Sequence, residues 1–422
     1  MKTVTLGRNA LGVWMSLASL AACSSGGSQM TPSSLHSFSL RKAKAQFQPH
    51  PGSPEYQVLF SFGSNVYGRN GAGPNASLIA VNGVLYGTTV SGGAYGGGTV
   101  FSITTNGKEQ VLHSFNAAGG FSGPESPLLA VNGTLYGTTV GGGAYGGGTI
   151  FSLNIGGYDF HVLHSFGNGA DGTQPMGSLI AKNGTLYGTT EEGGANSAGT
   201  VFSFQPTTSK ETILHAFGSG SDGLHPFAGV IVANDTLYGT TAQGGSADWG
   251  TVFSMTLSGT ETILHSFTGN PDGLAPGASL VLKQDTLYGT TYEGGAYNNK
   301  GTVFSISTTG MNERILHSFG NGSDGANPNS ELILVNGRLY GTTYTGGTIE
   351  EYGTVFRVST AGKEHVLHNF GSVQNDGFFP RAGLINVNET LYGTTPVGGI
   401  DLPSCPGSAP DCDYGTVFAL TL

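Results

Sequence analysis

Six histidines recur at one place of a repeated pattern, and imidazole groups repeated in this way raise the question of metal binding. They are His113, His164, His215, His265, His317 and His368, and Phe60 stands at the corresponding place of the first unit. Equivalent residues of a repeat architecture lie one per unit on a wide ring, so they cannot converge on a common ion. His161 and His365 each lie three residues before a member of the set, which places their side chains on the opposite face of a strand. We therefore expect the repeated histidines to be structural, between or at the edges of repeat units, and we expect no metal site and no cofactor.

A second repeated set is acidic. Five aspartates are each followed by glycine and, four places on, by proline: Asp171, Asp222, Asp272, Asp324 and Asp376. Asn70 and Gly120 take this place in the first two units. A calcium site needs several oxygen ligands at one point, which one carboxylate per unit does not supply. The Asp-Gly pattern instead predicts a turn that the aspartate side chain caps.

Other acidic residues break the repeat, and in a repeat protein a catalytic site is expected where the symmetry is broken. These residues are Glu191, Glu192, Asp248, Glu293, Glu350 and Glu351. They form no defined constellation, and the sequence contains no H-E-x-x-H, G-x-S-x-G or Walker motif. The sequence therefore names no catalytic residue.

Aromatic residues occur at shifting positions in the glycine-rich loops. They are Tyr95, Tyr145, Trp249, Tyr297, Tyr352 and Tyr414. Exposed tyrosine and tryptophan beside Asp and Asn are typical of a surface that binds polysaccharide or protein. The alternative is that these rings pack between neighbouring loops. We treat the six residues as a candidate ligand-binding face.

All of these residues are spaced by seven copies of the stretch Leu-Tyr-Gly-Thr-Thr. Its tyrosines are Tyr86, Tyr136, Tyr187, Tyr238, Tyr288, Tyr340 and Tyr392, at intervals of 50, 51, 51, 50, 52 and 52 residues. Such a period indicates a repeat architecture. Between residues 163 and 215 each short apolar segment is followed by a turn signal such as Asn183-Gly184, which predicts four antiparallel strands per unit. Glycine and threonine in the repeated stretch are expected to let neighbouring units pack closely.

Seven four-stranded units predict an all-β fold, a seven-bladed β-propeller over residues 56–422. Residues 415–422 end the chain on a third strand, while residues 56–62 supply a spare fourth strand. We expect these two strands to pair and close the ring, since pairing removes both open edges. Long loops and crossovers then share one face and tight turns share the other, and function is expected on the variable face.

The N-terminal residues predict export. Residues 1–22 have a positive start and an apolar run, and they lead to Leu20-Ala21-Ala22-Cys23, which resembles the bacterial lipobox. That resemblance implies lipidation of Cys23 and a membrane-anchored lipoprotein of the bacterial cell envelope, at the outer membrane or cell surface. An ordinary secretory signal is the alternative. Residues 23–55 read as a flexible tether. In an exported protein the remaining cysteines, Cys405 and Cys412, are expected to form a disulfide in the long last loop.

The combination of L-Y-G-T-T, G-T-V-F-S and L-H-S-F with a period near 51 resembles the bacterial GloVer (Gloeo-Verruco) tandem repeat. The unit layout is similar to that of kelch-type propeller repeats, although the Gly-Gly and Trp positions of kelch are not reproduced. The resemblance implies exported, surface-attached repeat proteins. It implies no activity and no functional residues.

Composition restricts the partners. Only 10% of residues are charged, the net charge is -10 and no basic stripe is present, which argues against nucleic acid. The leading hypothesis is a monomeric, lipid-anchored binding module for a glycan, peptide or envelope partner. The rivals are an exported polysaccharide hydrolase or lyase with acidic residues on the long-loop face, and a structural surface module without a specific ligand.

Overall fold

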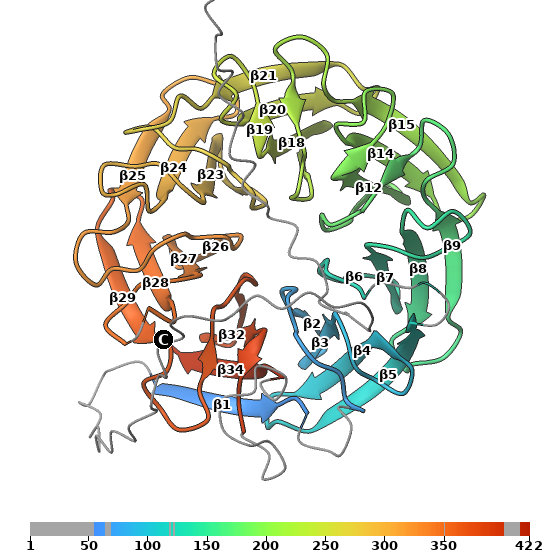
Figure 1. The fold of residues 1–422 in the computed structure, drawn as a ribbon, viewed down its shortest axis with the longest axis horizontal. Helices are drawn as coiled ribbons and strands as arrows, with labels where there is room; N and C mark the ends of the chain where they lie inside the picture. Colours follow the sequence, from blue (N-terminus) through green and yellow to red (C-terminus); the bar gives the residue numbers. More distant parts are fainter. Residues whose placement is uncertain (1–54, 64–68, 118–119, 121–122, 350, 401–413) are drawn as a thin grey trace, which may run out of the picture. The chain divides into compact units, whose positions relative to one another are not determined.

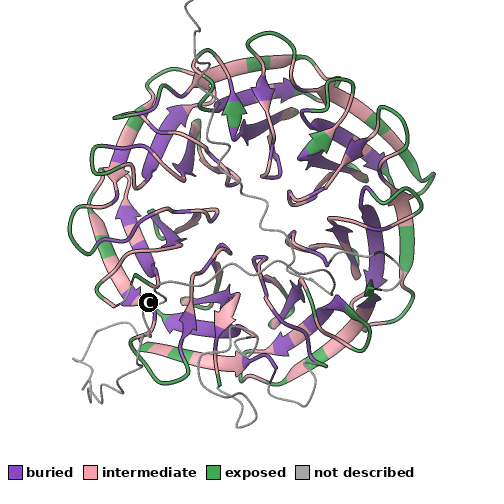
Figure 2. Ribbon diagram, viewed as in Figure 1, coloured by how far each residue is buried: buried purple, intermediate pink, exposed green. Residues whose placement is uncertain are grey.

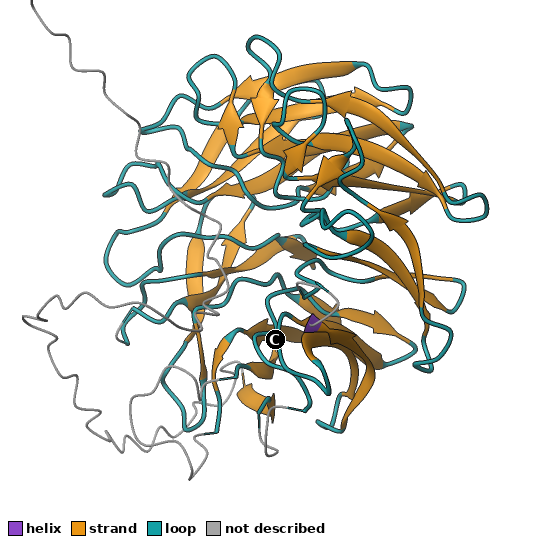
Figure 3. Cartoon of the chain, turned by 45° about the vertical axis from the view of Figure 1, so that its right-hand side comes forward, coloured by secondary structure: helices purple, strands orange, loops and turns teal. Residues whose placement is uncertain are grey.

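A computed structural model of the protein describes residues 55–63, 69–117, 120, 123–349, 351–400 and 414–422, all within the compact unit of residues 50–422. These residues form a ring of seven four-stranded antiparallel sheets around an axis (Figure 1). Strands joined by loops make up almost all of the described chain (Figure 3). The only helical residue among those described is Ala117, which is in 3₁₀ conformation. The predicted seven-bladed propeller is confirmed.

Blade 3 illustrates how the repeat folds. From the axis outward its strands are β11 (Ile180–Lys182), β12 (Thr185–Thr190), β14 (Thr200–Gln205) and β15 (Lys210–Ala216). The turn between β11 and β12 has positive φ at Asn183 (51°) and Gly184 (78°), as an Asn-Gly hairpin requires. A bulge in β14–β15 shifts the register between Val201 and Phe202.

The other blades repeat this order. Their strands are β2 (Ile79–Val81), β3 (Val84–Thr89), β4 (Gly96–Thr104) and β5 (Glu109–Asn116) in blade 1; β6 (Leu129–Val131), β7 (Thr134–Thr139), β8 (Thr149–Asn154) and β9 (His161–Ser165) in blade 2; β17 (Ile231–Ala233), β18 (Thr236–Thr241), β20 (Thr251–Thr256) and β21 (Glu261–Ser266) in blade 4; β22 (Val281–Lys283), β23 (Thr286–Thr291), β24 (Thr302–Ser307) and β25 (Arg314–Ser318) in blade 5; and β26 (Ile333–Val335), β27 (Arg338–Thr343), β28 (Thr354–Ser359) and β29 (Glu364–Asn369) in blade 6. Two-stranded ladders tie the crossovers to the long loops: β10 (Gly172–Thr173) with β13 (Glu192–Gly193), β16 (Gly223–Leu224) with β19 (Gln243–Gly244), and β30 (Gly377–Phe378) with β33 (Val397–Gly398).

Blade 7 closes the ring with the two ends of the described chain. It contains β31 (Ile385–Val387), β32 (Thr390–Thr395), β34 (Thr416–Thr421) and, as its outer strand, β1 (Glu55–Ser61). The register pairs Glu55 with Thr421 and Ser61 with Thr416. The predicted pairing of the first and last strands is therefore confirmed.

The Leu-Tyr-Gly-Thr-Thr stretch is architectural, as expected. In blade 3 a Cβ at Gly188 would lie 2.7 Å from Cζ of Phe202, so only glycine leaves room for this buried ring. The second threonine, Thr190, shares a 2.8 Å hydrogen bond with Thr200 of the next strand in its own blade. The first, Thr189, donates to the Ala228 carbonyl of the following blade at 2.8 Å. The motif thus joins strands within a blade and blades to each other.

The hydrophobic core runs around the ring between neighbouring blades (Figure 2). One cluster contains Tyr187, Val201 and Phe217 of blade 3 together with Leu237 and Phe253 of blade 4. Because each cluster needs two blades, no blade buries its apolar face alone. The closed ring then holds the loops of its long-loop face in fixed relative positions.

Candidate functional sites

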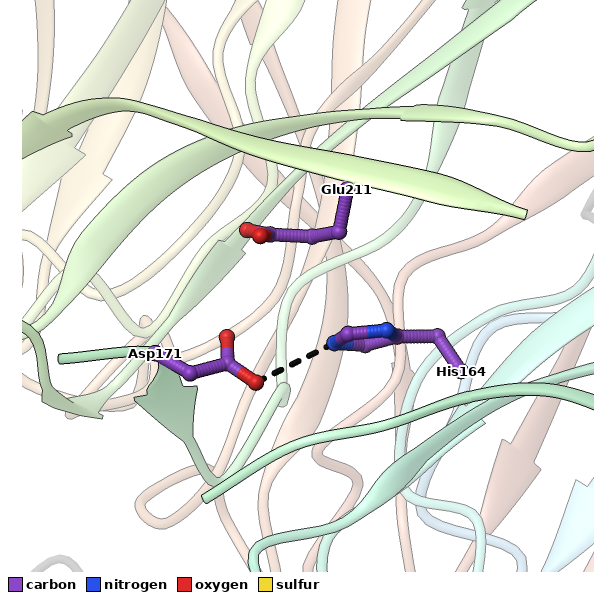
Figure 4. Close-up of side chains that lie close together, drawn as sticks. All are labelled: His164, Asp171 and Glu211. Atoms are coloured by element: carbon purple, nitrogen blue, oxygen red, sulfur yellow. Dashed lines mark hydrogen bonds and ion pairs between the residues drawn. The ribbon is translucent and has the colours of Figure 1, made fainter. Parts of the chain in front are cut away.

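A three-residue cluster lies at the interface of blades 2 and 3 (Figure 4). His164, near the end of outer strand β9, places Nε2 3.2 Å from Oδ2 of Asp171 in the crossover. Glu211, on the outer strand β15 of the next blade, faces this pair. One nitrogen or oxygen atom from each of the three residues lies within 4.8 Å of the others. The cluster exists only because two blades meet.

The cluster recurs around the ring. His215 contacts Asp222 at 2.9 Å and His265 contacts Asp272 at 3.1 Å, and Glu261 and Glu313 complete clusters that meet the same 4.8 Å limit. In the following interface His317 contacts Asp324 at 2.9 Å. The fourth histidine–aspartate pair has Glu364 in the corresponding place.

Three interfaces depart from this arrangement. In the one between blades 7 and 1, Phe60 and Asn70 take the histidine and aspartate positions, and the other two have an aromatic ring at the glutamate position. Tyr56 of the closing strand β1 takes the glutamate position in the last interface, where its ring stacks on His368 at 3.5 Å and its hydroxyl donates to Asp376. In the interface between blades 1 and 2, His113 stacks instead on Phe160 at 3.8 Å. Glycine takes the aspartate position there, at Gly120. Both interfaces replace the carboxyl group of the outer strand with an aromatic ring.

The glutamates of these clusters have raised pKa values. Burial raises the pKa of Glu211 to about 7, and the negative charge of Asp171 adds to the rise. The same cause raises the pKa of Glu261 and Glu364 to about 7. The hydrogen bond that His215 donates to the Asp222 carboxylate raises the pKa of His215. One carboxylate oxygen of each of these glutamates is buried and accepts no hydrogen bond from the described residues.

The sequence predicted part of this arrangement. The Asp-Gly turn is present, since Oδ1 of Asp171 accepts a hydrogen bond from the Gly172 amide at 2.8 Å. The histidines do lie between blades, as expected. The spacing of one histidine per blade excludes a single shared ion, but it does not show that an interface gathers its own aspartate and glutamate around each histidine. The missed signal is a glutamate four residues before the histidine of the next repeat.

A hollow of about 620 Å³ adjoins the first of these clusters. Tyr145, His164, Asp171 and Glu211 are among the residues that line it. The predicted aromatic residue of this loop and the three cluster residues therefore face one space.

The six candidate aromatic residues divide into two groups. Tyr95, Tyr145, Trp249 and Tyr297 are exposed, with 64%, 57%, 46% and 43% of their surfaces accessible. Tyr352 packs on Phe378, with ring centroids 4.4 Å apart, and Tyr414 packs against the core of the closing blades. Four of the six aromatic side chains are thus exposed on the long-loop face, where a ligand could contact them. The other two are packed against neighbouring residues, which is the alternative given for these residues above.

A second group of residues, drawn from five blades, is connected by one hydrogen bond and by the charges that its members exert on each other. We call it the axial cluster and define it as Glu125, Glu191, Tyr292, Tyr344 and Arg381. Glu125 and Arg381 each follow the proline of a crossover, while the other three each follow a Leu-Tyr-Gly-Thr-Thr stretch. They come from blades 2, 3, 5, 6 and 7, at positions where the other repeats carry different residues.

Contacts and charges connect the axial cluster. The Arg381 guanidinium donates to the Tyr344 hydroxyl at 3.4 Å and lies 5.1 Å from the centre of its ring. Burial raises the pKa of Glu125, and the positive charge of Arg381 opposes that rise. Burial raises the pKa of Glu191 to about 7, with further increases from the charges of Glu192 and Glu125. The cluster combines a carboxyl pair, a cation and two phenol rings.

Most of the predicted symmetry-breaking acids lie elsewhere. Glu191 belongs to the axial cluster, and Glu192 accepts a hydrogen bond from Gln174 in its own blade. Glu293 accepts one from Asn299, and Asp248 caps the Gly244 amide. Glu351 is exposed, and Glu350 lies outside the described residues. The sequence therefore identified one axial residue and missed the others.

Several predictions concern residues that the structure does not describe. Cys23, Cys405 and Cys412 all lie outside the described residues, as do the signal peptide and the tether. Among the described residues no helix is long and apolar enough to span a bilayer.

The family model of the Gloeobacter/Verrucomicrobia repeat matches residues 39–234 and 219–404. The chain belongs to this repeat family. No curated protein matches this chain.

Solved structures share its fold. The extracellular domain of a one-component system from B. thetaiotaomicron is 12% identical, with a TM-score of 0.53 over 85% of this chain and 40% of that one. An oligogalacturonate lyase in complex with manganese is 11% identical, with a TM-score of 0.50 over 88% and 96%. A gluconolactonase from Xanthomonas campestris is 14% identical, with a TM-score of 0.41 over 88% and 90%. At these identities the first two likenesses concern the fold alone, and the third, with its lower TM-score, supports no conclusion.

Proposed function

We propose that this protein is an exported binding module whose long-loop face holds a glycan, peptide or envelope partner at the axial cluster. The observation that carries the proposal is the convergence of Glu125, Glu191, Tyr292, Tyr344 and Arg381 from five blades. In a repeat protein the repeated residues build the scaffold. The places where the repeat is broken are therefore the ones expected to carry function.

The side chains of the axial cluster suit a polar ligand. Phenol rings cover the apolar faces of sugars or side chains and also offer a hydroxyl. Carboxylates accept hydrogen bonds from hydroxyl or amide groups, and arginine pairs with a carboxylate through two parallel bonds. An acidic glycan or a peptide carrying both polar and anionic groups fits this combination. The exposed Tyr145 and Trp249 extend the face toward its rim.

Glycan and peptide arrays test the proposal. Arg381→Gln and Tyr344→Phe are expected to lower binding of the array ligand at least tenfold, because each removes a polar contact without removing bulk. The double variant Tyr145→Ala and Trp249→Ala measures the share of the rim. Tyr158→Phe, at an exposed residue, is the matched control and is expected to bind as the wild type does. Full binding by both axial variants would refute the axial site, and no ligand on any array would favour a structural surface module.

An exported hydrolase or lyase is the second candidate, and one observation favours it. Burial raises the pKa of Glu191 to about 7, and the negative charge of the nearby Glu125 contributes to the rise. A carboxyl group with such a pKa is suited to donate a proton near neutral pH, and a second carboxylate suits it as a base. Polysaccharide turnover that is lost in Glu191→Gln, with folding retained, would replace the binding proposal with this one.

Anchoring is a separate part of the proposal. We propose that Cys23 carries the lipid and that the mature chain, a monomer, sits at the outer membrane or cell surface. Two acyl chains together are enough for stable membrane attachment. Cys23→Ala is expected to release the protein from membranes into the soluble fraction. The proposed disulfide between Cys405 and Cys412 is tested by the two-dalton change in mass on reduction.

A further inference from the structure

We propose that the His–Asp–Glu clusters at His164, His215 and His265 are metal sites, each of which takes one divalent transition-metal ion with Zn²⁺ as the preferred ion. The proposal concerns the blade interfaces and is independent of the axial cluster.

The ligand set fits such an ion. Each cluster offers one imidazole nitrogen and two carboxylates, all of them ligand types that zinc accepts, and three protein ligands leave a fourth position open. Two carboxylates beside one imidazole carry negative charge that a divalent cation would balance. An aspartate held by its turn and a glutamate on a strand of the next blade give the site ligands from two rigid elements.

The distances fit as well. Ligand bonds of about 2.0–2.2 Å in tetrahedral geometry place ligand atoms roughly 3.3–3.6 Å from each other. The His164 Nε2 to Asp171 Oδ2 distance is 3.2 Å, and the other two pairs are at 2.9 and 3.1 Å. The glutamate atom lies within 4.8 Å of both partners in each cluster.

A second, independent observation points to an occupant. The Oε1 atoms of Glu211, Glu261 and Glu313 are buried and have no hydrogen-bond partner among the described residues. A buried acceptor without a partner is unfavourable, so an ion or a proton is needed there. The hollow of about 620 Å³ beside His164 and Glu211 supplies a path for the ion and space for the fourth ligand.

The repeat provides its own controls. Glu109 has the same place on its outer strand, and its Oε1 is buried without a hydrogen-bond partner in the described part of the chain. The equivalent residues of its interface are, however, Phe60 and Asn70. Tyr56 fills the glutamate position of the last interface and bonds Asp376 directly. Neither interface offers the three ligands, so neither is expected to bind the ion.

Zinc binding is measured on the full mature chain without an affinity tag, after dialysis against a chelator. Equilibrium dialysis with Zn²⁺ at pH 7.5 is expected to give three fewer bound ions in the triple variant Glu211→Gln, Glu261→Gln, Glu313→Gln than in the wild type. Glu109→Gln is expected to match the wild type. Co²⁺ is expected to give the visible absorption of a low-symmetry site, which is lost in the triple variant.

Far-UV circular dichroism checks that the triple variant is folded. Should it fail to fold, the single change Glu211→Gln is expected to remove one ion. Equal zinc stoichiometry in the wild type and the folded glutamine variant would overturn the proposal. No bound zinc in the wild type would also overturn it and would mean that a proton satisfies the glutamates.

Discussion

Replacing Glu211 by glutamine should make the protein more stable at alkaline pH and change little at acidic pH. Burial raises the pKa of Glu211 to about 7 in the native protein, from an ordinary value near 4.5. Between these two values the native state holds a proton that the unfolded state has released. The free energy of unfolding therefore falls as the pH rises through this window. Glutamine cannot ionise and so avoids this loss.

The size of the effect follows from the shift. A rise from 4.5 to about 7 corresponds to at most about 3.4 kcal/mol at 1.36 kcal/mol per unit. Glu211 is only half-buried, so solvent screening reduces the expected value to about 1–2 kcal/mol. Urea denaturation at pH 5 and pH 8, in the presence of a chelator, measures the difference between variant and wild type.

Glu55→Gln is the matched control, because Glu55 is exposed on the outer strand β1. Its substitution is expected to shift stability equally at both pH values. The reasoning about Glu211 would be refuted if Glu211→Gln gained nothing at pH 8 relative to pH 5, or if it gained more at pH 5.

Three further substitutions test the scaffold by urea denaturation. Thr189→Val removes the hydrogen bond to the Ala228 carbonyl and should lower the free energy of unfolding by about 1–3 kcal/mol. Thr88→Val is the control and should leave it unchanged, because the Thr88 hydroxyl is buried without a partner among the described residues. Equal losses in the two variants would contradict the role assigned to Thr189. Gly188→Ala forces a methyl group against Phe202 and should lower the free energy of unfolding by about 1–3 kcal/mol. An unchanged urea midpoint would show that the Phe202 side chain moves aside without loss of stability. Tyr56→Phe removes the hydrogen bond to the Asp376 carboxylate and should lower the free energy of unfolding by about 1.5–3 kcal/mol. An unchanged free energy would mean that stacking of the aromatic ring on His368 is enough to stabilise the interface where the ring of blades closes.

The fold was predictable because its signals are local and repeated. Asn183-Gly184 fixes a hairpin, Gly188 and Thr190 fix strand contacts, and seven copies at one period imply a ring. The surplus strand at the N-terminus and the missing one at the C-terminus then required β1 to pair with β34. None of these inferences needs knowledge of how two blades pack.

The sites were less predictable because they depend on contacts between blades. Glu211 lies near His164 only because the outer strand of blade 3 packs against blade 2. Tyr56 belongs to the same position, four residues before Phe60, but its bond to Asp376 spans nearly the whole chain. The axial residues Glu125 and Arg381 look unrelated in the sequence because their proximity follows from ring closure.

The most direct test of the proposed function is a crystal structure of the protein with its best array ligand. The account predicts ligand density on the long-loop face against Arg381 and Tyr344. Density confined to the tight-turn face, or to the rim beside Tyr145 without contact to either residue, would contradict it.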